Sequence, residues 1–302
     1  MSIVTLDNRQ LRLVVNPEQG VDVLAFSAQR DGVWLPIMPD VQSGKSELAQ
    51  SSFLMVPYSN RIEDGRFTFA GQTYTLAHGE RHAIHGDVRT RAWNIQAQSE
   101  RRVRCTFNSR EYDAVNWPWP FLAVAEYQLD GWTLAANLAL TNLGDTPMPA
   151  GFGWHPYYSR HLTQPNEPVE LHFNVAGVYP DANNNRIPSG PGQLPVPAQD
   201  FRTPKPLDAS NFLDFCAYGY DGGGTIRWPQ SGVSLTYRCS PECSHLVIYN
   251  PAHPHFAVEP VTNANNGVNL LAAGDPTSGV TSLQPGETLR ATFETLVTLE
   301  SQ

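Results

Sequence analysis

The sequence predicts an all-β fold, and two observations support this. Glycine and proline supply 23 and 25 of the 302 residues and are spread along the whole chain, which leaves little room for long helices. Alternation of apolar and polar residues with a period of two recurs more often than any helical pattern. Because no repeat, charge run or low-complexity tract marks a boundary, we expect residues 1–302 to form one continuous β-sandwich or barrel domain.

The shorter strand candidates are bounded by turn residues, as isolated strands should be. In chain order they are Phe67–Phe69 and Tyr74–Leu76, joined across Ala70-Gly71-Gln72, then Val103–Phe107, and later Val233–Tyr237.

Two longer segments carry the strongest alternation. Leu122–Leu140 is interrupted by Asp130-Gly131, a dipeptide that tolerates positive φ and therefore suits a hairpin turn. Glu287–Glu300 places its apolar residues on one face and its polar residues on the other, which predicts a half-buried strand. Between them, residues 180–206 are dense in Asn, Pro and Gly and predict a long irregular loop, which is either functional or a surface excursion.

Charge and composition exclude several classes of partner. The chain has 20 basic and 29 acidic residues, a net charge of −9, which argues against nucleic acid or an anionic membrane as the main partner. Lys45 and Lys205 are the only lysines, so the other 18 basic residues are arginines. This excess of arginine over lysine reflects either recognition of oxyanions or the composition of the genome. No basic segment followed by an apolar stretch opens the chain, and no run approaches the roughly 18 apolar residues of a membrane span. We therefore expect a cytoplasmic enzyme.

The four cysteines, Cys105, Cys216, Cys239 and Cys243, are too few and too scattered for a disulfide framework, so we expect them to be reduced. The alternative is a metal site formed by Cys239, Cys243 and His245. Their spacing lacks the close C-x-x-C pairing of structural zinc sites, so we predict no metal.

Four clusters set histidines and carboxylates among aromatic residues. The first is YSNRIEDGRF, with Asn60 and Arg61, and the second is RHAIHGDVRTRAW. In the second, His82 and His85 are three apart, so in an extended chain they face opposite sides and at most one lines a given cleft.

The third and fourth clusters contain one candidate catalytic residue each. In GFGWHPYY, His155 lies between glycines that permit close approach of a ligand and aromatic rings that suit a pyranose face, although a core histidine is the alternative. In HPHFAVEPVTNANN, Glu259 follows an apolar run, where a carboxylate is either paired structurally or kept for chemistry.

Together the clusters resemble the aldose 1-epimerase family, the galactose mutarotases, over almost the full chain and in the family's order. The matching segments are Asn60-Arg61-Ile62 with Gly65 and Phe67, His82 to Gly86 with Trp93, Asn116 to Phe121, Thr141-Asn142, Met148 to Tyr157, Leu213-Asp214 with Tyr220-Asp221-Gly222, and Val258-Glu259-Pro260. Asp87 and Tyr158-Ser159-Arg160 depart from the commoner pattern, so the identity of the sugar stays open.

The resemblance implies a galactose mutarotase-like β-sandwich with a sugar-binding cleft, and a reaction that interconverts the α and β anomers of a hexose. Removing the proton from the anomeric hydroxyl while protonating the ring oxygen requires one base and one acid. By similarity Glu259 is the base, ionised at working pH, and His155 is the acid, protonated at working pH.

The resemblance further implies that the remaining site residues bind substrate. His85 lies on the ring-oxygen side, Asp214 accepts from ring hydroxyls, and Arg61 donates to a hydroxyl or orients a carboxylate. The other substrate-binding candidates are Asn60, Trp154 and Tyr157, with Trp93 as a further packing candidate. No nucleotide, flavin or metal cofactor is implied, and the sequence makes no prediction of oligomeric state.

Two alternatives stay open. One is an epimerase of a C6-phosphorylated or C6-sulfonated hexose, which needs arginines beyond Arg61; the candidates are Arg89, Arg91, Arg160 and Arg186. The other is a carbohydrate-binding protein without turnover, which would not need both an acid and a base.

Overall fold

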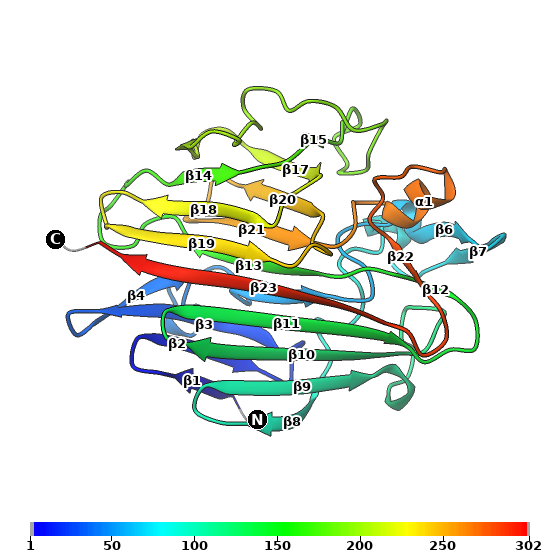
Figure 1. The fold of residues 1–302 in the computed structure, drawn as a ribbon, viewed down its shortest axis with the longest axis horizontal. Coiled ribbons are helices and arrows are strands. Elements are labelled where there is room, and N and C mark those ends of the chain that lie inside the picture. The colour runs from blue at the N-terminus through cyan, green and yellow to red at the C-terminus, as the bar shows by residue number, and fades with distance from the viewer. Residues whose placement is uncertain (1–2, 301–302) are drawn as a thin grey trace.

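Two large antiparallel sheets pack face to face in the computed structural model, which describes residues 3–300 (Figure 1). This confirms the predicted all-β sandwich. The predicted strands are also confirmed: the short candidates and both arms of the Leu122–Leu140 hairpin coincide with strands of the structure, except that the strand predicted at Tyr74–Leu76 ends at Thr75. The loop of that hairpin is Gly131-Trp132, one residue beyond the predicted Asp130-Gly131, because Asp130 still pairs with Thr133.

The first sheet has ten strands. In spatial order they are β1 (Val4–Asp7), β2 (Leu11–Asn16), β3 (Asp22–Arg30), β5 (Ser52–Met55), β13 (Gly153–Ser159), β21 (His255–Val261), β20 (His245–Asn250), β17 (Leu213–Tyr218) and β15 (Gly177–Val178), with β4 (Val33–Met38) paired to β3.

The second sheet has nine strands. In spatial order they are β16 (Lys205–Pro206), β14 (Glu170–Phe173), β18 (Gly223–Trp228), β19 (Val233–Cys239), β23 (Thr288–Leu299), β11 (Thr133–Asn142), β10 (Phe121–Asp130), β9 (Arg102–Asn108) and β8 (Asn94–Gln98).

Smaller elements gather at one end of the sandwich, on the right of Figure 1. They include the pairs β6 (Arg66–Phe69) with β7 (Gln72–Thr75) and β12 (Met148–Ala150) with β22 (Thr281–Leu283), and the helix α1 (Gly267–Ala272). Short 3-10 turns complete the elements: η1 (Val41–Ser43), η2 (Glu63–Gly65), η3 (Gly79–Arg81) and η4 (Ser109–Glu111).

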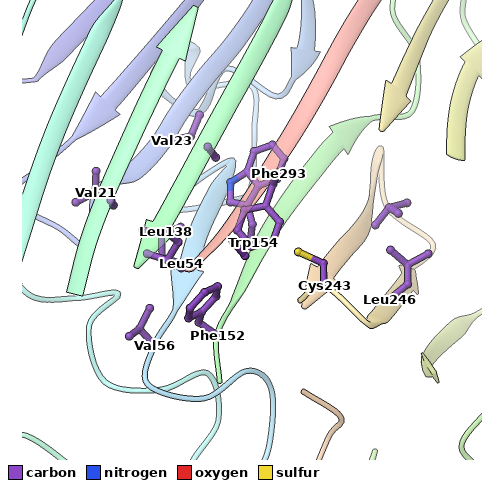
Figure 2. Close-up of a cluster of buried hydrophobic side chains, with 14 of the residues drawn as sticks. Val21, Val23, Leu54, Val56, Leu138, Phe152, Trp154, Cys243, Leu246 and Phe293 are labelled. Atoms are coloured by element: carbon purple, nitrogen blue, oxygen red, sulfur yellow. The ribbon is translucent and has the colours of Figure 1, made fainter. Parts of the chain in front are cut away.

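The main core lies between the two sheets, and strand alternation decides which side chains enter it. In β23, Leu289, Ala291 and Phe293 are buried as predicted, while Arg290 between them is exposed. Trp154 of β13 is fully buried and packs beside Phe293 from the opposite sheet, with ring centroids 6.3 Å apart (Figure 2). The two sheets are therefore joined by interdigitated apolar side chains.

Replacing Trp154 with alanine is expected to lower the free energy of unfolding by about 3–5 kcal/mol, because it empties a large site in the core. Urea denaturation of the purified variant measures this. Trp154→Phe refills most of the volume and is the matched control. A loss below about 1 kcal/mol for Trp154→Ala would contradict the packing described.

A second, smaller apolar cluster lies on the other face of the ten-stranded sheet. It contains Val261 together with Phe53, Met55 and Val247, and the last three are each next in sequence to a residue of the main core. The outer face of this sheet therefore has a small apolar cluster of its own. Residues 180–206 form the predicted long irregular loop, with only Lys205–Pro206 as a strand, and arch beyond β17 at the top of Figure 1.

The four cysteines are free, as expected. His245 does not turn toward Cys239 or Cys243 in a ligand arrangement; its ring nitrogens lie 3.3 Å from Tyr179 Oη and 2.9 Å from Ser244 Oγ.

Candidate active site

A polar pocket of about 270 Å³ opens on the outer face of the ten-stranded sheet. It is smaller than the roughly 300–1,000 Å³ typical of sites for drug-sized ligands, as suits a single sugar ring. The predicted site residues that line it are Asn60, Arg61, His85, His155, Tyr157, Asp214 and Glu259; Arg186, Phe212, Tyr249 and Asn265 complete the wall.

Neighbouring antiparallel strands bring His155 and Glu259 together. In the pairing of β13 with β21, Gly153 lies opposite Val261 and Tyr157 opposite Ala257, which sets the two residues across from each other. Nε2 of His155 lies 3.2 Å from Oε1 of Glu259. Both side chains are buried, and they come from positions 104 residues apart in sequence, so only the sheet register makes this contact.

Burial sets the protonation of this pair. Desolvation lowers the pKa of His155 to about 3, and it raises the pKa of Glu259 well above its usual range. Both shifts favour the neutral forms, so burial alone does not stabilise the ionised Glu259 and protonated His155 that the resemblance implies at working pH.

Aromatic rings hold the His155 imidazole. Phe53 of β5 stacks on it with centroids 4.3 Å apart, and the Tyr157 ring lies 4.6 Å away on another side. His85 meets it edge-on at 5.4 Å. With these contacts the imidazole has little rotational freedom, which is what a positioned acid or base requires.

His85 reaches the pocket from a tight turn. His85 and Gly86 both have positive φ, and a Cβ on Gly86 would lie 2.0 Å from the carbonyl oxygen of Val56, so glycine is required there. His82 points away from the pocket, toward Asp64. Only one of the two histidines lines the cleft, as predicted. The expected cause, opposite faces of an extended chain, is wrong, because this segment is a series of turns and not a strand.

The segment carrying Asn60 and Arg61 is fastened to the chain that follows Glu259. Asn266 N donates to the carbonyl oxygen of Arg61 at 2.7 Å, and Ser59 N donates to Oδ1 of Asn263 at 3.1 Å. The carbonyl oxygen of Asn60 in turn accepts from the backbone N–H of His85 at 2.6 Å. Three sequence clusters therefore meet at one wall of the pocket.

Asp214 of β17 forms the far wall. Burial raises its pKa, and Arg186 opposes this through a hydrogen bond from Nε to Oδ2 at 2.7 Å. Arg186 comes from the 180–206 loop, so this loop contributes directly to the pocket and is not only a surface excursion.

Trp154 and Trp93 do not reach the pocket, so the expectation that they contact substrate is wrong. Trp154 precedes His155 in a strand, and adjacent strand residues point to opposite faces, so Trp154 enters the main core. Trp93 is buried in the same core against Phe107.

Three pocket residues were not predicted, Phe212, Tyr249 and Asn265, and Arg186 was predicted only for the alternative substrate with an anionic C6 group. The alternation of β20 and the TNANN sequence after Glu259 were available signals for Tyr249 and Asn265. Phe212 and Arg186 precede strands or lie in loops, where spacing predicts no direction for a side chain.

Unpartnered polar atoms indicate what the pocket binds. Among the described residues, buried Nδ2 of Asn60, Nδ1 of His155, Oε2 of Glu259 and Oδ1 of Asn265 have no hydrogen-bond partner. Buried polar groups without partners are costly, so such atoms at one pocket require a ligand or water that both donates and accepts. Hydroxyl groups do both.

The two-sheet sandwich, with its polar pocket on the outer face of one sheet, is a galactose mutarotase-like fold. The sequence pattern described as aldose 1-epimerase matches residues 2–295. The chain therefore belongs to the aldose 1-epimerase family.

The chain is also similar to individual proteins over nearly its full length. The uncharacterized protein YphB of Escherichia coli K12 is 26% identical over 302 residues, covering 95% of this chain and 96% of its own. A galactose mutarotase-like protein from Clostridium acetobutylicum has a TM-score of 0.82 at 18% identity, covering 99% and 95% of the two chains. A galactose 1-epimerase from Lactobacillus acidophilus NCFM has a TM-score of 0.78 at 17% identity, with the same coverage.

Across residues 3–300, no helix is long and apolar enough to cross a membrane. Within the same residues, no group of three or more His, Cys, Asp or Glu side chains has the arrangement of a metal site.

Proposed function

We propose that this protein is an aldose 1-epimerase that interconverts the α and β anomers of a hexose, with His155 and Glu259 as its acid and base. The supporting observation is their 3.2 Å contact in a pocket whose other polar groups suit sugar hydroxyls. Since Arg61, His155 and Glu259 come from distant parts of the chain, we also propose that residues 1–302 act as one domain.

The reaction needs only the one proton that the pair shares. When a sugar binds and its hydroxyls hydrogen-bond to the pair, Glu259 passes its proton to Nε2 of His155, which gives a carboxylate and an imidazolium. Glu259 then takes the proton of the C1 hydroxyl while His155 protonates the ring oxygen, and the C1–ring-oxygen bond breaks to give the aldehyde. Rotation at C1 and reversal of both transfers closes the ring on its other face.

The remaining residues bind and orient the ring in this proposal. His85 is half-buried, and desolvation lowers its pKa well below the usual value, so it is neutral and offers a hydrogen bond without a competing charge. Arg61 donates to a hydroxyl, and Asp214 accepts from one.

The test is to follow freshly dissolved α-glucose and α-galactose by polarimetry with and without the protein. We expect the approach to anomeric equilibrium to be faster than in buffer alone. If the protein binds these sugars but accelerates neither, it is a carbohydrate-binding protein and the catalytic proposal fails.

The pH dependence should separate a buried pair from an exposed one. A solvent-exposed glutamate and histidine share a single proton only between about pH 4.3 and 6.5, so activity would peak near pH 5.5. Here the pair takes up a second proton only near pH 3, the lowered pKa of His155, and gives up its proton only well above the usual range of a glutamate. We therefore expect the pH range of maximal buffer-corrected kcat/KM to be wider, on both sides, than that of an exposed pair; a bell limited to about pH 4.3–6.5 would contradict this.

A second candidate is the epimerase of a C6-phosphorylated or C6-sulfonated hexose. Of the four candidate arginines, Arg160 is hydrogen-bonded to carbonyl and amide oxygens and Arg91 is paired with Asp87. Arg186 lines the pocket but is paired with Asp214. The guanidinium of Arg89 lies 5.4 Å over the ring of Phe53, and within residues 3–300 its side chain makes no ion pair or hydrogen bond. Faster anomerisation of glucose 6-phosphate than of glucose, lost in Arg89→Gln, would favour this candidate.

A further inference from the structure

Arg186 and Asp214 meet through a single hydrogen bond instead of the usual fork. Nε of Arg186 donates to Oδ2 of Asp214 at 2.7 Å, and the two side chains are 17% and 18% exposed. Nη1 of Arg186 points elsewhere, to the carbonyl oxygen and Oδ1 of Asn184 at 2.7 and 2.8 Å. The pairing therefore engages only part of each group.

This leaves one donor and one acceptor next to each other at the pocket. Nη2 of Arg186 lies on the same edge of the guanidinium as Nε, and among the described residues it makes no hydrogen bond. Oδ1 of Asp214 also makes none within this part of the chain. Because both residues line the pocket, Nη2 of Arg186 and Oδ1 of Asp214 supply a donor and an acceptor at its far wall that no described protein group occupies.

Arg186 is held firmly for this position, although it lies in an irregular loop. Its backbone N–H donates to Oδ2 of Asp181 at 3.0 Å, and its carbonyl oxygen accepts from Nδ2 of Asn265 at 2.9 Å. Its guanidinium lies 5.5 Å over the ring of Phe212. The loop thus presents a fixed cation, since backbone and side chain are both anchored.

We propose that Arg186 and Asp214 together bind two hydroxyl groups on adjacent ring carbons of the substrate and so select sugars with that diol. One hydroxyl donates to Oδ1 of Asp214, and its neighbour accepts from Nη2 of Arg186. This inference rests on the proposed function for its substrate class, and it assigns the 180–206 loop a role in specificity.

The physical basis is the asymmetry of hydrogen-bond recognition. A site built to bind a hydroxyl rejects the analogue without it, because the protein's own donor or acceptor is then left unpaired. Charged partners strengthen the effect, since hydrogen bonds to ionised groups are about twice as strong as neutral ones.

The experiment measures binding of glucose and its 2-, 3-, 4- and 6-deoxy analogues by calorimetric titration, alongside kcat and KM for anomerisation. Proteins compared are the wild type, Arg186→Leu, Arg186→Lys and Asp214→Asn. We expect the wild-type protein to bind two of the deoxy analogues at least about tenfold more weakly than it binds glucose. Arg186→Leu should cancel the penalty for one of them, and Asp214→Asn the penalty for the other, at the adjacent carbon.

Arg202→Leu is the matched control. Arg202 lies in the same loop and forms a forked pair with Asp200, at 2.9 and 2.7 Å, outside the pocket. It should leave all the deoxy penalties unchanged. Arg186→Lys keeps a cation beside Asp214 and preserves the loop, so it should retain the fold and regain part of the discrimination if Arg186→Leu folds poorly.

Three results would overturn the inference. The first is deoxy penalties that Arg186→Leu and Arg186→Lys leave unchanged, and the second is cancelled penalties at carbons that are not adjacent. The third is an equal loss of affinity for all the sugars in Arg186→Leu, which would assign Arg186 a structural role only. Because the penalties are read from binding, a wild type that discriminates the diol without accelerating anomerisation would refute the proposed catalysis and leave this inference standing.

Discussion

Glu259→Gln is expected to reduce kcat about 10²–10⁴-fold, the usual contribution of a general base. Glutamine has nearly the same shape and can still hydrogen-bond to His155, but it cannot accept the proton of the C1 hydroxyl. KM should change little, because the sugar keeps its other partners. Stopped-flow polarimetry or exchange NMR, corrected for the spontaneous reaction, measures the loss.

Glu167→Gln is the matched control for this variant. Glu167 is also buried, but its carboxylate is satisfied by Leu162 N, Ser231 N and Ser231 Oγ at 2.7–3.0 Å, and it lies outside the pocket. Glu167→Gln should lower the free energy of unfolding and leave kcat unchanged. Glu259 has an unpartnered Oε2 instead, so Glu259→Gln should be at least as stable as the wild type. Unchanged turnover in Glu259→Gln would remove it as the base.

Strand alternation and the order of motifs predicted most of the fold and most of the pocket. The half-buried strand at Glu287–Glu300 and the Leu122–Leu140 hairpin needed only local patterns. The pocket residues on β13 and β21 followed from the resemblance. The same alternation would have excluded Trp154, since it is adjacent to His155 in a strand and faces the other way.

The rest depended on contacts that no local pattern contains. Arg186 reaches Asp214 from an irregular loop, and its direction is fixed by backbone hydrogen bonds to Asp181 and Asn265. The pKa shifts of His155 and Glu259 likewise follow from burial of the two side chains, and this burial depends on tertiary packing that no local pattern contains.

His155→Asn is expected to reduce kcat by a similar factor, about 10²–10⁴-fold, and to leave the fold intact. Asparagine still donates to Glu259 but cannot carry a proton to the ring oxygen. The fold does not depend on hydrogen bonds from the His155 ring, because Nδ1 has no partner within the described residues and Nε2 contacts only Glu259. Kinetics and thermal unfolding of the same preparation measure both parts.

His245→Asn is the control for a buried histidine with a structural role, because its ring is hydrogen-bonded to Ser244 and Tyr179 away from the pocket. It should lose stability and keep kcat. If His155→Asn behaves like His245→Asn, with a lowered unfolding temperature and normal turnover, His155 is a core histidine and the assignment of the acid is wrong.

The double variant His155→Asn/Glu259→Gln tests whether the two residues act as one unit. Ring opening moves a proton onto Glu259 and another off His155 in the same event, so removing either residue already prevents the exchange. We therefore expect the double variant to be no slower than the slower single variant. Multiplicative losses would mean that each residue contributes independently, which is incompatible with a single proton shared across the 3.2 Å between Nε2 and Oε1.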